Sequence, residues 1–206
     1  MIKRMPANAA EPIEEQSLRA DAQRNYDALV DAAAVVFAVS GIDVPIKELA
    51  ERAGVGVGTV YRRFPKRSDL IVAVFRREVD MCAEAASVVA SDHAPFEALT
   101  RWLRRYQDLI VTKRGLAAAL RSDESAYDGL PRYFEDRMVP PLQGLLRAAG
   151  NEIKVEVSAV ELLRAVASLC APAASGDVDQ TNRMVALLLR GLRSLAEERQ
   201  GHGGSR

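Results

Sequence analysis

The sequence predicts an all-α protein, with a small N-terminal helix-turn-helix unit followed by a larger helical bundle. Apolar residues recur at helical spacing through almost the whole chain, and the period-two alternation of strands is nearly absent. Glycine or proline marks the boundaries of several helical segments. The 206 residues are enough for one large domain or two small ones with a real core.

The first predicted helix runs from Asn25 to Val39, and Gly41 ends it. Its inward face is made of apolar residues at helical spacing: Leu29, Val30, Ala33, Val36 and Phe37. Pro45 opens the second helix, because the N–H that proline lacks has no partner in a first turn. This helix extends to about Ala53.

A third, short helix is predicted from Val57 to Arg63, directly after the glycine-rich turn that Gly54 opens. Two helices joined by such a turn form a helix-turn-helix. Val60 and Phe64, four residues apart, are expected to face the core. The outward residues are then Val57, Gly58, Thr59, Tyr61, Arg62 and Arg63. Glycines without side chains would let the backbone approach a duplex, and Arg and Tyr could reach phosphates and base edges.

Charge is balanced over the chain but not along it. The sequence has 28 basic and 28 acidic residues, yet the window 52–77 holds seven basic residues against one acidic residue, a net charge of 7 − 1 = +6. The densest run consists of Arg62, Arg63, Lys66 and Arg67. Alone, such a run is more often a solvated face; inside a helix-turn-helix, binding to DNA is the favoured interpretation.

After Pro65 a long linking helix is predicted from about Ser68, followed by five more helices. Their expected ranges are 96–111, 113–121, 133–149, 158–170 and 181–198. Pro140 and Pro141 are expected to kink or break the third of them. The last two are apolar on more than one face, so we expect a second subunit to cover them. The candidate dimer-interface residues are Leu162, Val166, Leu169, Leu188 and Leu192.

The stretch from about Arg24 to Phe75 resembles the DNA-binding domain of tetracycline-repressor-like (TetR-family) regulators. The resemblance is carried by LVDAAAVVFAVSG and PIKELAERAGVGVGTVYRRFPKRSDLIVAVF, and its most specific part is the Gly-Thr-aliphatic-Tyr-x-x-Phe core. It implies a ligand-responsive transcriptional regulator, most often a repressor. Such a protein would bind a near-palindromic operator on double-stranded DNA as a homodimer and be released by a small-molecule effector.

The resemblance also implies roles for single residues. Thr59 and Tyr61 would contact phosphates, and the base-choosing positions would be Val57, Gly58 and Arg62. Lys47 would reach a base or a phosphate, and Arg67 would clamp the DNA backbone. Arg63 stands where a histidine is common, which should keep a phosphate contact. Gly56 replaces a frequent serine, so the third helix lacks a side-chain cap and is expected to be loosely held without DNA.

The expected division is a disordered arm at 1–18, the DNA-binding domain at 19–66, a ligand-binding and dimerisation bundle at 67–200, and a disordered tail at 201–206. Bundles often hold a pocket between their helices, and aromatic residues are candidates to line it. These are Trp102, Tyr106, Tyr127, Tyr133 and Phe134. Each of them singly is more often an ordinary core or surface aromatic.

Other function classes find little support. The apolar stretches are too short to span a membrane and no signal peptide is visible, so a cytoplasmic protein is expected. The two cysteines and two histidines lack the company of a metal site, and no enzyme or cofactor motif is present. We therefore predict no catalytic residues, no metal and no cofactor. The alternative is a helical ligand-binding or protein-interaction bundle whose helix-turn-helix does not read DNA. Salt-dependent DNA binding would separate the two.

Overall fold

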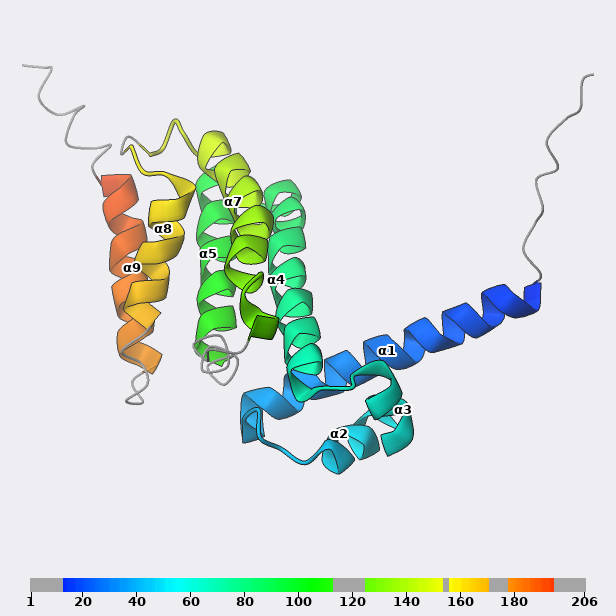
Figure 1. The fold of residues 1–206 in the computed structure, drawn as a ribbon. Coiled ribbons are helices and arrows are strands. Elements are labelled where there is room, and N and C mark those ends of the chain that lie inside the picture. Colours follow the sequence, from blue (N-terminus) through cyan, green and yellow to red (C-terminus); the bar gives the residue numbers. More distant parts are fainter. Residues whose placement is uncertain (1–12, 113–124, 154–155, 171–177, 195–206) are drawn as a thin grey trace, which may run out of the picture.

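The computed structural model describes residues 13–112, 125–153, 156–170 and 178–194, and no strand occurs among them (Figure 1). The all-α fold class is therefore confirmed. The helices are α1 (Ile13–Ser40), α2 (Ile46–Ala53), α3 (Val57–Arg63), α4 (Arg67–Asp92), α5 (Pro95–Thr112), α7 (Leu130–Ala148), α8 (Ala159–Cys170) and α9 (Val178–Ser194), with a 3₁₀ turn, η1 (Ser125–Tyr127). The helix expected at 113–121 and the tail at 201–206 lie outside the described residues.

The molecule has two parts that α4 connects. Helices α1, α2 and α3 form a small unit, called the head below, beside the start of α4 (Figure 1). In the bundle, α4, α5 and α7 pack against one another, and α8 and α9 lie on the far side of α5 from α4. The candidate DNA-binding helix α3 and the candidate dimer helices α8 and α9 are thus at opposite ends of the molecule.

Helix α1 is longer than the sequence analysis predicts. It begins at Ile13 instead of Asn25 and extends away from the rest of the molecule (Figure 1). Residues 13–18, expected in a disordered arm, are therefore helical, while residues 1–12 lie outside the described part. The physical reason is that 13–25 contains Glu, Gln, Leu, Arg and Ala but no glycine or proline. Good helix formers continue a helix that the packed residues further along have already established.

Two separate cores hold the structure together, and α4 contributes to both. The head core contains residues of α1, α2 and α3 together with Leu70 and Val74 of α4. The bundle core begins at Val79 and Cys82 of the same helix. Phe75 packs against both cores. The expected boundary at residue 66 thus marks the start of a helix, but the packing of the head extends two turns beyond it.

Helix α7 continues through Pro140 and Pro141, which the sequence analysis expected to kink or break it. Buried residues on both sides of the prolines, Met138 and Leu142, belong to the bundle core. The burial of these side chains offsets the backbone hydrogen bonds that proline removes, so helix α7 is not broken.

None of the helices in the described ranges is long and apolar enough to cross a membrane.

Candidate nucleic-acid interface

A left-handed glycine closes the first half of the helix-turn-helix. Gly54 has φ 67° and ψ 27°, a conformation that costs an L-residue about 1–2 kcal/mol. Its N–H points at the carbonyls of Ala50 and Glu51, and the N–H of Val55 donates to the Ala50 carbonyl at 3.0 Å. These bonds satisfy the end of α2 and direct the chain into α3.

Helix α3 is anchored by its inward side chains. Val60 is 1% exposed and Phe64 is buried, and both belong to the head core, as their spacing predicts. Gly56 precedes the helix in an extended conformation with no side-chain cap. Its carbonyl accepts the N–H of Thr59 at 2.9 Å. Packing on one face therefore orients a helix of only seven residues.

The opposite face of α3 is turned to solvent. Tyr61 is 54% exposed and Val57 39%, and Gly58 and Arg62 are exposed as well. A Cβ added at Gly58 would meet no atom within 4 Å. The Thr59 hydroxyl accepts a hydrogen bond from Nη2 of Arg62 at 3.1 Å, which orders the guanidinium along the helix. The structure thus leaves these four predicted DNA-contacting residues exposed on α3, and Thr59 beside them is half-buried.

The two lysines predicted to contact DNA are also exposed. Lys47 lies on α2, with its ammonium nitrogen 3.8 Å from a carboxylate oxygen of Glu51. Such a surface pair contributes little and leaves the lysine available to a phosphate. Lys66 precedes α4, and its backbone N–H donates to Asp69 at 3.0 Å while its side chain faces solvent.

Arg67, which is predicted to clamp the DNA backbone, has hydrogen-bond partners within the protein. Its guanidinium donates to two backbone carbonyls of the loop between α1 and α2, those of Ile42 and Val44, the latter at 2.7 Å. The side chain is half-buried and joins the start of α4 to a loop more than twenty residues earlier. Sequence reasoning missed this role because backbone carbonyls leave no signal in residue types.

Arg63 also has a partner inside the protein. Its guanidinium carbon lies 5.2 Å from the centre of the Tyr26 ring, and that ring is 5.4 Å from the ring of Phe64. Arg63 therefore faces α1, away from the surface that carries Tyr61. Tyr26 was not among the predicted site residues, although it precedes the buried pair Leu29 and Val30 by one helical turn.

The five candidate pocket aromatics divide between the two cores, and Tyr133 lies against the bundle core. Trp102, Tyr106 and Phe134 form a contiguous row, with ring centres 6.2 Å and 5.9 Å apart. Trp102 is fully buried and donates from Nε1 to the carbonyl of Cys82 at 2.8 Å. Burial raises the pKa of the Cys82 thiol to about 12, so the thiol beside this row stays neutral. Tyr127 instead packs into the head core, away from this row.

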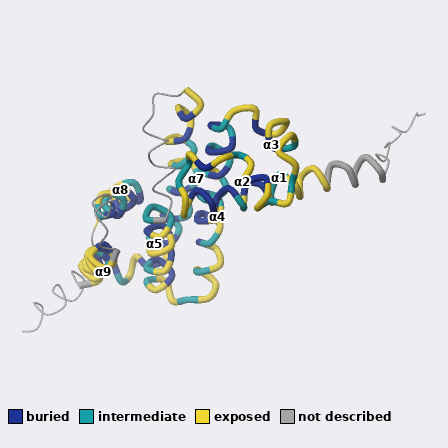
Figure 2. Tube along the Cα trace, turned by 90° about the horizontal axis from the view of Figure 1, so that it is seen from below, coloured by how far each residue is buried: buried dark blue, intermediate teal, exposed yellow. Residues whose placement is uncertain are grey.

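The predicted dimer residues all pack in or against the core of their own chain, and their part in a dimer stays a prediction. Leu162, Val166 and Leu192 are buried in the bundle core, and Leu169 and Leu188 are half-buried against it. The sequence shows apolar residues at helical spacing on α8 and α9, but it does not show which of their faces the chain itself covers. Two exposed apolar side chains of α9 were missed: Met184, 37% exposed, and Leu187, 57% exposed. Three residues apart, they share one face of α9, whose exposed positions are visible in Figure 2.

Within the described part of the chain, no three His, Cys, Asp or Glu side chains gather where they could hold a metal ion.

Comparisons with known proteins agree with this arrangement. Residues 29–74 match the family model "Bacterial regulatory proteins, tetR family", and residues 94–194 match "Transcriptional regulator SbtR-like, C-terminal domain". The crystal structure of the TetR transcriptional regulator SCO0520 from Streptomyces coelicolor is 32% identical, with a TM-score of 0.66. The similarity covers 81% of this chain and 97% of that one.

Two further relatives are more distant. An HTH-type transcriptional regulator of Staphylococcus aureus (strain USA300) is 29% identical over 84 residues, which are 40% of this chain and 45% of that protein. The chain therefore spans about half the length of this curated relative. The regulator FadR from Bacillus subtilis, solved with stearoyl-CoA, is 18% identical with a TM-score of 0.57, over 82% of this chain and 98% of that one. At this identity the likeness shows the fold alone.

Proposed function

This chain belongs to the TetR family of DNA-binding transcriptional regulators, and we propose that it is a repressor released by a small-molecule effector. The single observation that carries the proposal is the exposed face of α3. Val57, Gly58, Tyr61 and Arg62 face solvent on a helix whose other face is fixed in the head core. A helix presented in this way fits the major groove of B-DNA.

We propose that the protein binds a near-palindromic operator as a homodimer. Met184 and Leu187 would be buried between the two α9 helices, because apolar side chains this exposed gain free energy when a partner covers them. A two-fold dimer presents two identical α3 helices, which matches the symmetry of a palindrome. Half-sites about one helical turn apart, or a multiple of it, are expected.

The effector would act through α4, since this helix packs in both cores. A ligand that displaces part of the row of Trp102, Tyr106 and Phe134 would move the bundle half of α4. The head half, with Leu70 and Val74, would follow and change the spacing of the two α3 helices. Ligand and DNA would then weaken each other's binding by the same factor.

Selection of bound sequences from a random duplex library, at two salt concentrations, tests the proposal. We expect a near-palindromic site whose recovery falls steeply at high salt, because phosphate contacts release counterions. The variant Tyr61→Ala, which removes an exposed side chain from α3, should select the same site poorly. A non-palindromic site would contradict the dimeric arrangement. Failure to select any sequence at either salt would favour the alternative, a bundle whose helix-turn-helix does not read DNA.

A further inference from the structure

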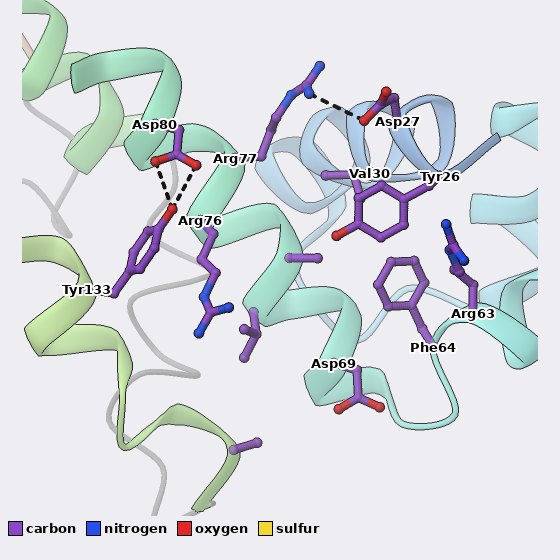
Figure 3. A pocket seen from close by; sticks show the side chains of 13 residues that line it. Tyr26, Asp27, Val30, Arg63, Phe64, Asp69, Arg76, Arg77, Asp80 and Tyr133 are labelled. Carbon is purple, nitrogen blue, oxygen red and sulfur yellow. Dashed lines mark hydrogen bonds and ion pairs between the residues drawn. The ribbon is translucent and has the colours of Figure 1, made fainter. Parts of the chain in front are cut away.

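A groove of about 630 Å³ lies where the head meets the bundle, and one of the predicted pocket residues, Tyr133, lines it. It is called the junction groove here. Its walls come from α1, α3, α4, η1 and α7, and they include Tyr26, Phe64, Val72, Arg63, Arg76 and Tyr133 (Figure 3). The volume is in the usual range for small-molecule sites.

One carboxylate of the junction groove is fully engaged by the protein. Asp80 of α4 accepts hydrogen bonds from the Tyr133 hydroxyl at 2.7 Å and from Nε of Arg137 at 2.5 Å. Burial and the hydrogen bond to Asp80 raise the pKa of Tyr133, so this hydroxyl remains a donor. The negative charge of Asp80 is therefore neutralised by a residue outside the groove.

The other two carboxylates are engaged as well. Asp27 of α1 lies 3.5 Å from the guanidinium of Arg77. Asp69 accepts the backbone N–H of Lys66 at the start of α4, where the partial positive charge of the helix end also favours an anion. The three carboxylates that line the groove in the described part of the chain thus all have partners.

Two guanidinium groups of the groove have no carboxylate partner among the described residues. Arg76 stands over the Tyr133 ring, 4.9 Å from its centre, and Arg63 stands 5.2 Å from the centre of the Tyr26 ring (Figure 3). An arginine on an aromatic face keeps its N–H donors directed outward in the guanidinium plane. Both cations therefore remain able to bind an anion.

We propose that the junction groove binds a small organic anion, a carboxylate or phosphate carried on an apolar body. Arg76 would bind the charged group, and the apolar body would extend along the groove against Val72 and Phe64, toward Arg63 (Figure 3). Arg76 has no carboxylate partner to release among the described residues.

The site is coupled to DNA binding by its position, a consequence that rests on the proposed function. Arg63, the last residue of α3, also lines the groove, so an anion held there lowers the positive potential near the DNA-binding surface. The groove also spans α3 and α7, so its occupant joins the head to the bundle. The anion and DNA are therefore antagonists, and each reduces the affinity of the other equally.

The test uses the full chain, with 2-naphthoate as the probe and the neutral 2-naphthylmethanol as its isostere. Arginine Nε–H and backbone amide signals are followed by NMR during each titration. We expect saturable shifts at Arg63, Ala73 and Arg76, weaker binding of the alcohol, and about tenfold weaker naphthoate binding by Arg76→Gln. Arg132→Gln, on the exposed surface of α7, is the matched control and should bind as the wild type does. Equal affinity of acid and alcohol, an unaffected Arg76→Gln variant, or the absence of saturable shifts at the groove would each overturn the proposal.

The probe titration contains no DNA, so it remains decisive even if the library selection recovers no operator. With an operator in hand, naphthoate should weaken DNA binding severalfold in the wild type and much less in Arg76→Gln. Equal weakening of both proteins would overturn the coupling through the groove.

Discussion

The head and the bundle differ in how their apolar residues relate to the surface. In the head, short helices leave one face to the core and one to solvent, so Val60 is buried while Tyr61 beside it is exposed. In the bundle, α8 and α9 are apolar on several faces, and the single chain covers some of them and not others. Leu188 is half-buried, yet its neighbour Leu187 is 57% exposed. Where a helix has one apolar and one polar face, the sequence shows which side chains are exposed and available for function. Where a helix is apolar on several faces, the sequence does not show this.

The contrast is limited by α4, which belongs to both parts. Val74 is buried in the head core and Val79 in the bundle core, only five residues further along the same helix. Tyr127 and Leu130, from beyond α5, also pack into the head. A change in one core should therefore be felt in the other, and the following experiments test how far this coupling extends.

The largest effect is expected for Trp102→Ala in the bundle. The side chain is 0% exposed, and its loss leaves a cavity and removes the hydrogen bond that Nε1 donates to the Cys82 carbonyl. Replacing a buried tryptophan by alanine costs about 3–5 kcal/mol. Urea unfolding, followed by circular dichroism, should show this loss in one transition, because α4 links the cores. A loss below about 1 kcal/mol would instead indicate that the surrounding side chains collapse into the space that Trp102 leaves.

The next effect concerns the surface of the bundle. Leu187→Glu should dissociate the proposed dimer, at a cost of about 3 kcal/mol or more, because the interface would bury a charge without a partner. Sedimentation velocity measures the change. Val88→Glu is a matched control, since Val88 on α4 is 58% exposed against 57% for Leu187. Dissociation by both variants, or by neither, would contradict an interface on this face of α9.

Two arginines of the head should separate structural from DNA-binding roles. Arg67→Gln should lower the free energy of unfolding by about 1–3 kcal/mol, because the carbonyls of Ile42 and Val44 lose their donor. Arg62→Gln, on the exposed face, should change stability by less than about 0.5 kcal/mol. The salt dependence of operator binding should be affected in the reverse order, more by Arg62→Gln than by Arg67→Gln. If Arg62 contacts a phosphate its loss lowers the salt slope by about one, whereas the slope for Arg67→Gln should stay near the wild-type value.

The positions of Arg67 and Leu162 show what could be predicted from sequence. The helices, the turn at Gly54 and the inward pair Val60 and Phe64 follow from local spacing and from glycine conformation, so they could be read directly. The partners of Arg67 are backbone carbonyls brought near by the fold, and no residue type announces them. Leu162 was placed at a dimer interface because its helix is apolar all round, but packing within the chain decides which faces remain open. The junction groove was missed for the same reason: its residues come from five elements and meet only in the tertiary structure.

The smallest expected change in stability is for Gly58→Ala, and its comparison with Gly54→Ala separates a glycine needed for DNA binding from one needed for the backbone conformation. Gly58 lies inside α3, where glycine costs about 0.5–1 kcal/mol relative to alanine, and a methyl group there would meet no atom of the protein. Gly58→Ala should therefore raise the free energy of unfolding by about 0.5–1 kcal/mol. If the glycine permits close approach to a duplex, the same variant should weaken operator binding, measured by fluorescence anisotropy.

Gly54→Ala is the contrasting control for that experiment. It has equally open space around its Cα, but its φ of +67° makes alanine unfavourable by about 1–2 kcal/mol. It should therefore lose stability, and any loss of DNA binding should follow from that. The expected pattern is that Gly58→Ala raises stability and lowers DNA affinity, whereas Gly54→Ala lowers both. This pattern would mean that the glycine at position 58 costs the head some stability and lets the backbone approach the duplex. Unchanged DNA affinity in Gly58→Ala would remove this explanation, and contact with the operator would then rest on the exposed side chains of the head, such as Tyr61 and Arg62.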